Sequence, residues 1–242
     1  MRCDSMRNGK LIKNLYLCFY SIQYCIMYNM EITMTLRIGD TAPDFTIATT
    51  KGEINFHAWS GDSWVFFFSH PADFTPVCTT EMGRTAQLAG EFDARNTKPL
   101  GLSTDTVEEH VKWIEDVNDT QNTTLEFPIV ADADHKIAEL YDMIHPGESE
   151  TAAVRSVFII DPNKKIRLTM TYPMSCGRNF DEILRVIDAL QTADKHKIAT
   201  PADWTMGSKV IIPPSVSNEE AKVQFPQGFD EQRPYLRFTE VK

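Results

Sequence analysis

The feature that most constrains this 242-residue chain is an uninterrupted apolar and aromatic run over Ser63–His70, with the sequence SWVFFFSH. A strand with one wet face alternates apolar and polar side chains, whereas a continuous run predicts a strand covered on both faces. Such strands lie inside sheets that carry helices on both sides. Pro71 ends the run and opens a short loop that extends to Pro76. The chain is therefore expected to build a layered α/β domain around this strand.

Strand-like and helix-like stretches alternate from Leu36 onward. The further predicted strands are Pro99–Thr104, Phe127–Ala131, Ser156–Asp161 and Ile166–Tyr172. One predicted helix begins at Val77 and a second follows a cap at Asp105 or Thr106. Two more cover His135–Ile144 and Phe180–Gln191. The last two strands are joined by Pro162-Asn163-Lys164-Lys165, a sequence suited to a hairpin turn. This order predicts an α/β fold with a thioredoxin-like mixed sheet flanked by helices.

Each predicted helix has one apolar face with which it packs onto the sheet. The expected faces are Met82, Ala86, Ala89 and Phe92; Val107, Val111, Ile114 and Val117; Ile137, Leu140, Tyr141 and Ile144; and Ile183, Ile187 and Leu190. At the start of the second helix, Glu108 or Glu109 is expected to complete a capping box with the preceding residue.

The C-terminal part differs in texture from the α/β domain, which we place at residues 34–200. Prolines interrupt the chain after Pro201, and the short runs Lys209–Ile212 and Tyr235–Phe238 predict a small α+β module over residues 201–242. By analogy we expect this module to pack across a homodimer partner. Its alternating side chains Tyr235, Arg237 and Thr239 suggest an added edge strand.

Residues 1–33 form an N-terminal extension with four basic residues ahead of the mixed run Leu15–Tyr28. A signal peptide or a membrane anchor is one interpretation. The run is interrupted by polar residues and is too short to cross a bilayer. We therefore prefer an extension without a fold of its own, upstream of a start at Met30 or Met34.

Charge and cysteine usage exclude several classes of protein. The net charge of −10, without a basic stripe, argues against a nucleic-acid binder. Five cysteines stand at positions 3, 18, 25, 78 and 176, and none forms a C-x-x-C pair. Zinc knuckles and dithiol redox loops are thus excluded. Beyond the extension only Cys78 and Cys176 remain, a reduced pattern that predicts a cytoplasmic protein.

The stretch that carries chemistry lies between Pro71 and Glu81. Cys78 is expected in the first turn of a helix, where free N–H groups and the helix dipole stabilise a thiolate. Thr75 lies three residues earlier with a hydroxyl able to reach groups beside the sulfur. Such a pocket suits nucleophilic attack on an O–O bond. The bland alternative is that Cys78 is a small buried residue without reactivity.

The pattern Pro71-x-x-x-Thr75-x-x-Cys78 resembles the active-site signature of the peroxiredoxin family. The quoted motifs run from Gly61-Asp62-Ser63-Trp64 through Cys78-Thr79-Thr80-Glu81 to Arg155, Gly177-Arg178-Asn179-Phe180-Asp181-Glu182-Ile183-Leu184-Arg185 and Ala199-Thr200-Pro201-Ala202-Asp203-Trp204. Together they look like the 1-Cys subfamily and cover residues 36–242. The resemblance implies a thiol peroxidase that reduces hydrogen peroxide and organic hydroperoxides, phospholipid hydroperoxides among them, through a cysteine sulfenic acid, without metal or organic cofactor.

The resemblance also implies roles for individual residues. Cys78 matches the peroxidatic cysteine, Thr75 the hydroxyl that orients the peroxide, and Arg155 the guanidinium that favours the thiolate. Pro71 matches the residue that closes the pocket, with His70 and Glu81 as its polar neighbours. From the residues alone, Arg155 could equally be a solvated arginine. His70 is by itself more often a structural residue than a base, and no companion constellation supports a Cys–His protease.

Cys176 is the main departure from a one-cysteine enzyme. A second thiol near the first could form an internal disulfide with it. Cys176 is not where the resembled subfamily places a resolving thiol, so we interpret it as a passenger. Reduction then falls to an external thiol such as glutathione or thioredoxin.

Two other functions are considered from the sequence. Some members of the resembled subfamily are also phospholipases, but Gly61-Asp62-Ser63-Trp64-Val65 lacks the final glycine of a nucleophile elbow. His57 matches the histidine of that site, while Asn163 stands where its aspartate is expected, so this activity is not predicted. A peroxide-sensing or chaperone-like protein is the alternative to a peroxidase.

Overall fold

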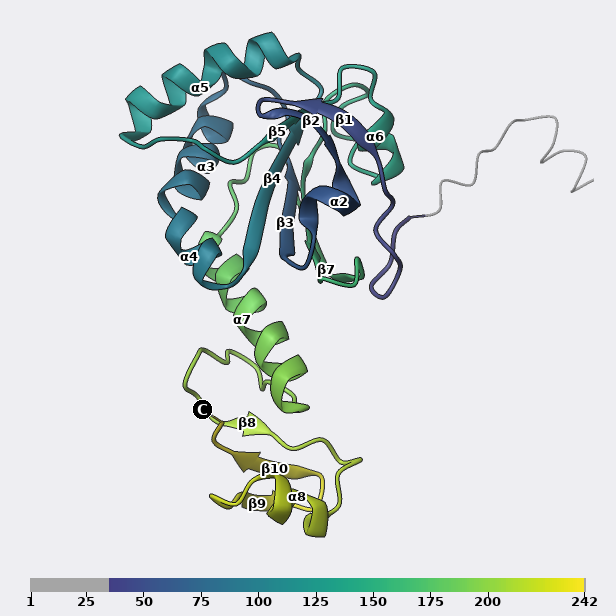
Figure 1. The fold of residues 1–242 in the computed structure, drawn as a ribbon, viewed down its shortest axis with the longest axis vertical. Coiled ribbons are helices and arrows are strands. Elements are labelled where there is room, and N and C mark those ends of the chain that lie inside the picture. The colour runs from purple at the N-terminus through teal and green to yellow at the C-terminus, as the bar shows by residue number, and fades with distance from the viewer. Residues whose placement is uncertain (1–34, 242) are drawn as a thin grey trace, which may run out of the picture. The chain divides into compact units, whose positions relative to one another are not determined.

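The computed structural model describes residues 35–241. Its main sheet has seven strands in the order β2-β1-β5-β4-β3-β6-β7 (Figure 1). The strands are β1 (Thr46–Thr49), β2 (Gly52–Asn55), β3 (Trp64–Ser69), β4 (Thr97–Ser103), β5 (Ile129–Ala131), β6 (Arg155–Ile160) and β7 (Ile166–Tyr172). β3 pairs in parallel with β4 and antiparallel with β6, so the sheet is mixed, as predicted.

Helices cover both faces of this sheet (Figure 1). They are α2 (Phe56–Ser60), α3 (Pro76–Gln87), α4 (Ala89–Ala94), α5 (Val107–Gln121), α6 (Lys136–Leu140) and α7 (Phe180–His196). Every residue of β3 is buried, which confirms the strand predicted from the apolar run. No helix among residues 35–241 is long and apolar enough to cross a membrane. The expectations for residues 1–33 lie outside the described residues.

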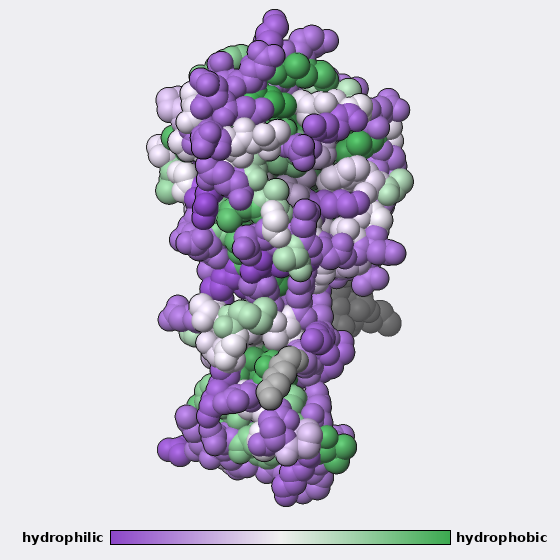
Figure 2. Space-filling view, turned by 60° about the vertical axis from the view of Figure 1, so that its left-hand side comes forward, coloured by the Kyte–Doolittle hydropathy of each residue, from purple (hydrophilic) through white to green (hydrophobic). Residues whose placement is uncertain are grey.

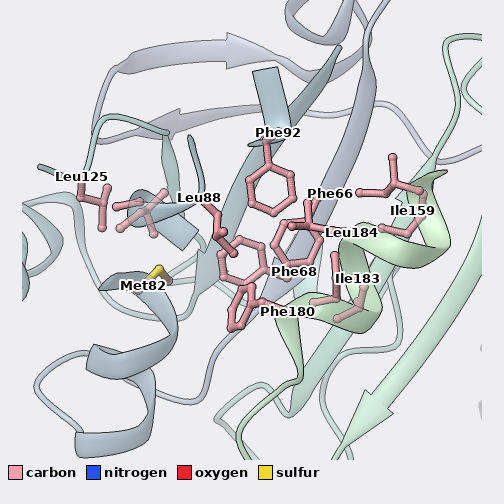
Figure 3. Packing of buried hydrophobic residues seen from close by; sticks show 14 of the residues in the cluster. Phe66, Phe68, Met82, Leu88, Phe92, Leu125, Ile159, Phe180, Ile183 and Leu184 are labelled. Atoms are coloured by element: carbon pink, nitrogen blue, oxygen red, sulfur yellow. The ribbon is translucent and has the colours of Figure 1, made fainter. Parts of the chain in front are cut away.

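The strand β3 supplies side chains to two separate cores. Phe66 and Phe68 point into the core shared with α3, α4, α5 and α7, where Phe66 stacks on Phe92 at 5.4 Å between ring centroids (Figure 3). Val65 and Phe67 point into the opposite core, formed with α2 and α6. Because side chains alternate across a strand, one run of four aromatic and aliphatic residues holds both helical layers.

Three details of the helices differ from the sequence prediction. The helix that contains Cys78 ends at Gln87, and the chain turns at the buried Leu88 before α4, which leaves Ala89 exposed. The predicted helix His135–Ile144 is only Lys136–Leu140, and its last residue is 44% exposed. The final helix extends to His196 instead of Gln191.

The buried face of α5 matches the predicted one only in part, because Val117 is buried and Ile114 packs against the core as expected, but Val111 does not. Thr106 caps the helix, and its capping box with Glu109 confirms the predicted start. Val111 is 48% exposed, whereas His110 and Trp113 are completely buried beside Val117. A prediction based on apolar residues alone places valine, not histidine, on the buried face of a helix. His110 is nevertheless buried because it has polar partners inside the protein, which offset the free-energy cost of its burial.

The close approach of α3 and α5 depends on Gly83. A Cβ atom at this position would lie 2.3 Å from Cγ of Gln121. Such contacts are impossible without displacing one helix. Glycine therefore allows α5 to lie close to α3, where the indole N–H of Trp113 donates to the hydroxyl of Thr79.

The C-terminal part contains β8 (Val210–Ile211), α8 (Asn218–Gln224), β9 (Asp230–Arg233) and β10 (Leu236–Thr239). These strands form a separate sheet in the order β8-β10-β9. The prediction of an edge strand at Tyr235–Thr239 is wrong, because β10 lies in the middle of this sheet and both its edges are paired. Trp204 and Phe225 belong to its own small core. In the view of Figure 2, the surface of the whole molecule is largely hydrophilic, and hydrophobic residues form small patches on it.

The observed face of α5 predicts different effects for two substitutions of the same type. Val117→Ala removes two buried methyl groups and should lower the free energy of unfolding by about 2 kcal/mol. Val111→Ala, on the same helix, should change it by less than about 0.5 kcal/mol because the side chain is half exposed. Urea unfolding of both variants measures the difference, and equal losses would contradict the described packing.

Candidate active site

Cys78 lies in the first turn of α3. Thr75, with extended backbone, precedes the helix, and Pro76 is its first residue, one position before the predicted start. The backbone N–H of Thr79 donates to the carbonyl of Thr75 and closes this turn. Cys78 is 0% exposed and is packed in the core that contains Phe68 and Met82. The sulfur is thus held near a helix N-terminus and away from bulk water.

Arg155 reaches Cys78 from the first position of β6. Its Nη1 lies 3.3 Å from Cys78 Sγ and also donates to Glu81 Oε2 at 2.8 Å. Its Nε and Nη2 donate to the carbonyl oxygen of Met174, at 2.9 and 2.7 Å. At 3% exposure it is not a solvated arginine, so that alternative is wrong. A guanidinium at this distance stabilises a sulfur anion.

Glu81 holds a second arginine beside the first. Its Oε1 accepts from the backbone N–H and Nε of Arg178, and its Oε2 accepts from Nη2 of Arg178 at 2.5 Å. Nη1 of Arg178 donates to the carbonyl of Ser69 at the end of β3. Burial alone raises the pKa of the Glu81 carboxyl, but Arg178 and then Arg155 outweigh burial and hold the pKa below its usual range. The carboxylate is therefore ionised between two cations.

The loop between β3 and α3 places the other predicted residues differently. Pro71 is buried beside His70. The hydroxyl of Thr75 donates to the carbonyl of Ala72 at 2.8 Å, so it is engaged within the loop. His70 contacts neither Arg155 nor Glu81 through hydrogen bonds; its Nε2 lies 2.9 Å from Asp73 Oδ1. The structure joins Cys78, Arg155 and Glu81 directly and keeps His70 in a neighbouring polar cluster.

Several residues of the site were not assigned by sequence reasoning. Arg178 was visible only as part of a motif, and its burial between Glu81 and β3 could not be read from its type. Arg155 donates to the backbone carbonyl of Met174, and a backbone contact cannot be predicted from the type of the residue. Asp73 and His110 form hydrogen bonds 37 residues apart in the chain, which no local pattern reveals.

Ser63 and His57 have separate partners. The Ser63 hydroxyl donates to Oδ1 of Asn96 at 2.9 Å. His57 Nε2 lies 2.8 Å from the carbonyl oxygen of Ala42, and its Nδ1 is 4.0 Å from a carboxylate oxygen of Asp44. Neither contact joins the serine to the histidine, and the carboxylate near His57 is Asp44 instead of a residue at position 163.

Comparisons with known proteins identify the family of the chain. The model of the AhpC/TSA family matches residues 38–169, and that of the C-terminal domain of 1-Cys peroxiredoxin matches residues 189–228. The chain belongs to the peroxiredoxin family. It is 52% identical to a 1-Cys peroxiredoxin of Dictyostelium discoideum over 204 residues, which cover 84% of this chain and 85% of the relative. This peroxiredoxin is accordingly a thiol peroxidase, an oxidoreductase.

Solved structures support the fold of this peroxiredoxin. A yeast mitochondrial 1-Cys peroxiredoxin matches with a TM-score of 0.80 and 51% identity, covering 86% of this chain and 100% of that one. A cysteine-to-serine mutant of the peroxiredoxin 6 of Arenicola marina matches with a TM-score of 0.82 and 43% identity, covering 86% and 99%. The thioredoxin-like α/β fold predicted from the sequence is thereby confirmed.

The two buried arginines predict that Glu81 is essential for stability. Glu81→Gln leaves both cations without a counter-charge and should cost about 3–5 kcal/mol of unfolding free energy at pH 7. Because the folded pKa of Glu81 is lowered, its contribution is fully present above the usual glutamate pKa and is lost as pH falls through the folded value. The gap between wild type and variant should therefore shrink in acid.

The matched control is Glu182→Gln, which breaks the partly exposed pair with Arg185. This variant should lose no more than about 1 kcal/mol. Urea unfolding between pH 7 and pH 3 measures both variants. Equal losses for the two, or a gap for Glu81→Gln that widens in acid, would refute the electrostatic role described here.

Proposed function

We propose that this peroxidase reduces hydroperoxides through the thiolate of Cys78. The observation that carries the proposal is the 3.3 Å contact between Nη1 of Arg155 and the sulfur, inside a site closed to bulk water. A nearby cation and the first turn of α3 favour the ionised, nucleophilic form of the thiol. Glu81 keeps Arg155 in place by accepting from the same nitrogen.

The chemistry proceeds in two stages. The thiolate attacks one peroxide oxygen, an S–O bond forms while the O–O bond breaks, and the departing alkoxide or hydroxide takes up a proton. The cysteine is then a sulfenic acid. An external thiol attacks its sulfur, releases water and leaves a mixed disulfide, and a second thiol restores Cys78 and carries away the disulfide. Arg155 can stabilise the negative charge that moves from sulfur to the leaving oxygen.

Thr75 and Pro71 complete the proposed pocket. The Thr75 hydroxyl now donates to Ala72 within the loop, and its free lone pairs can accept a hydrogen bond from a peroxide hydroxyl. Pro71, buried at the start of the loop, removes one backbone donor and stiffens the segment that ends at α3. Both residues shape the approach to Cys78 without taking part in bond formation.

We further propose that glutathione or thioredoxin supplies the reducing thiol and that Cys176 is dispensable. The yeast relative has been studied for thiol resolution through the glutathione and thioredoxin systems. Cys176 is exposed, with Sγ 3.7 Å from the carbonyl oxygen of Gly177, while Cys78 is buried.

We also propose that the protein is a homodimer and that it is located in the cytoplasm. Light scattering tests the homodimer, and the mass of a single chain at micromolar concentration would contradict it. Cell fractionation tests the location, and recovery of the protein in mitochondria would contradict it.

The two described cysteines give a matched pair of variants. Cys78→Ser should abolish hydrogen peroxide consumption in the presence of a thiol reductant, because serine is not ionised at neutral pH. Cys176→Ser should retain turnover within about twofold, as expected for an exposed side chain outside the reaction. Stopped-flow peroxide consumption with glutathione and with thioredoxin measures both.

Other results would redirect the proposal. Slow, stoichiometric oxidation in the wild type would favour a sensor instead of a peroxidase. Loss of turnover in Cys176→Ser, together with a Cys78–Cys176 disulfide in peptide maps of the oxidised wild type, would make Cys176 a resolving cysteine.

A further inference from the structure

The residue before α3 does not cap the helix in the usual way. Thr75 has extended backbone and occupies the N-cap position, where a threonine hydroxyl commonly accepts a backbone N–H of the first turn. The Thr75 hydroxyl makes no such bond and donates instead to the carbonyl of Ala72 at 2.8 Å. The side chain is thus directed at the loop, and its position depends on other contacts of the first turn.

Thr79 holds the backbone of Thr75 from inside the helix. Its backbone N–H donates to the carbonyl oxygen of Thr75 at 3.0 Å, and its hydroxyl donates to the same oxygen at 2.9 Å. The first bond belongs to any α-helix, whereas the second requires a side-chain hydroxyl and slightly weakens a helix by competing with it. Two donors on one oxygen fix the peptide unit that follows Thr75, and with it the backbone that carries the Thr75 side chain.

Trp113 on α5 orients the hydroxyl of Thr79. The indole is 0% exposed, and its N–H donates to Oγ1 of Thr79 at 3.2 Å. A buried indole N–H requires an acceptor, and this oxygen is its partner. A hydroxyl has one hydrogen that rotates to suit its surroundings. A donor that already occupies the oxygen removes some of those rotations and leaves the hydrogen directed at Thr75.

The indole itself is held in a fixed place. The helix α5 lies beside α3 (Figure 1), and the glycine at position 83 permits this approach. Trp113 packs in the core that also contains Cys78, and His70 stacks on its ring at 5.1 Å between centroids. A close-packed aromatic side chain of this kind keeps one orientation. Its N–H is therefore a rigid reference point for the first turn of α3.

We propose that Trp113 and Thr79 are positioning residues for Thr75. The indole N–H orients the Thr79 hydroxyl, which holds the Thr75 carbonyl and so keeps the Thr75 hydroxyl ready to accept a hydrogen bond from a hydroperoxide. The proposal rests on the proposed function, in which Thr75 contacts the peroxide while Cys78 attacks it. Neither positioning residue takes part in bond formation. Their effect is on the geometry of the residue three positions before the sulfur.

The test compares two reactions of the same thiol. Reaction with hydrogen peroxide requires both the thiolate and the Thr75 contact, whereas alkylation by iodoacetamide requires only the thiolate. Thr79→Val keeps the shape of the side chain and removes the hydroxyl, so both of its side-chain hydrogen bonds are lost. In stopped-flow measurements the peroxide rate constant should fall about tenfold, while the alkylation rate stays within about twofold. Thr79→Ser retains a hydroxyl and should keep the peroxide rate within about twofold of the wild type.

A double-mutant cycle tests whether Trp113 acts through Thr79. Trp113→Phe keeps an aromatic ring beside His70 but removes the N–H, and its peroxide rate should fall about fivefold. Two independent contributions would multiply to about fiftyfold in the double variant. Because we assign both residues to one chain of hydrogen bonds, the double variant should match Thr79→Val within about twofold.

Thr80 provides the matched control on the same turn. Its exposed hydroxyl donates to the carbonyl of Val77 at 2.7 Å, so Thr80→Val removes a bond of the same kind one position along the helix. This bond ends at Val77 and not at Thr75. Thr80→Val should therefore keep both the peroxide rate and the alkylation rate within about twofold. A loss of the peroxide rate equal to that of Thr79→Val would show a general need for hydroxyls in this turn and would overturn the proposal.

The remaining outcomes separate the positioning role from the proposed function. A wild type that does not react with peroxide defeats the function itself. With a normal wild type, the positioning role is overturned if Thr79→Val retains its peroxide rate, if both rates fall alike, or if Thr79→Ser fails to restore the peroxide rate. Losses that multiply in the double variant would remove Trp113 from the chain of contacts. If Thr79→Val does not fold, Trp113→Phe decides, because an unchanged peroxide rate or a parallel fall in alkylation overturns the proposal.

Discussion

The candidate active site depends on one buried carboxylate shared by two guanidinium groups. Glu81 on α3 binds Arg155 from β6 and Arg178 from the segment before α7, and so ties three distant parts of the chain together at the sulfur. Two cations brought together without an anion would repel each other in this low-dielectric setting. With the anion between them, one arginine is free to direct the same nitrogen at Cys78. Burying these charges costs desolvation free energy, and the result is that Nη1 of Arg155 is held in a fixed position beside the sulfur.

The second polar cluster holds the loop from the other side. Asp73 receives both histidines, and its backbone N–H donates to Asp105 at 2.9 Å. The next residue, Phe74, adopts a positive φ of 54° and is 55% exposed, a conformation that side-chain-bearing residues rarely adopt. Such strain persists where the surroundings over-determine the backbone. The fixed neighbours of Phe74, Asp73 in the cluster and Thr75 at the start of α3, meet that condition.

The sequence patterns predicted those structural features that are encoded by residues close together in the chain. The apolar run of β3, the turn that places Cys78 on α3 and the capping box at Thr106 are encoded within a few residues, and all are observed. The inner face of α5 was predictable only in part: Val117 lies on it as expected, but His110 lies there because an aspartate 37 residues away stabilises it. The burial of Arg178 was missed for the same reason, because a charged side chain is buried only where residues distant in the chain provide its partners. Leu140 was misplaced because α6 ends where a longer helix was expected.

The complete burial of Cys78 imposes an order on the catalytic cycle. A sulfenic acid carries an additional oxygen atom, and the sulfur of Cys78 is fully buried with Nη1 of Arg155 3.3 Å away, so neighbouring side chains are expected to shift to accommodate that atom. Oxidation must therefore loosen the contacts that the thiolate keeps tight. A reductant larger than a peroxide cannot reach the fully buried sulfur while these contacts are intact, so its reaction is expected to follow that loosening. The burial of the resting sulfur therefore limits its reaction partners by size, since a small molecule can enter where a larger one cannot.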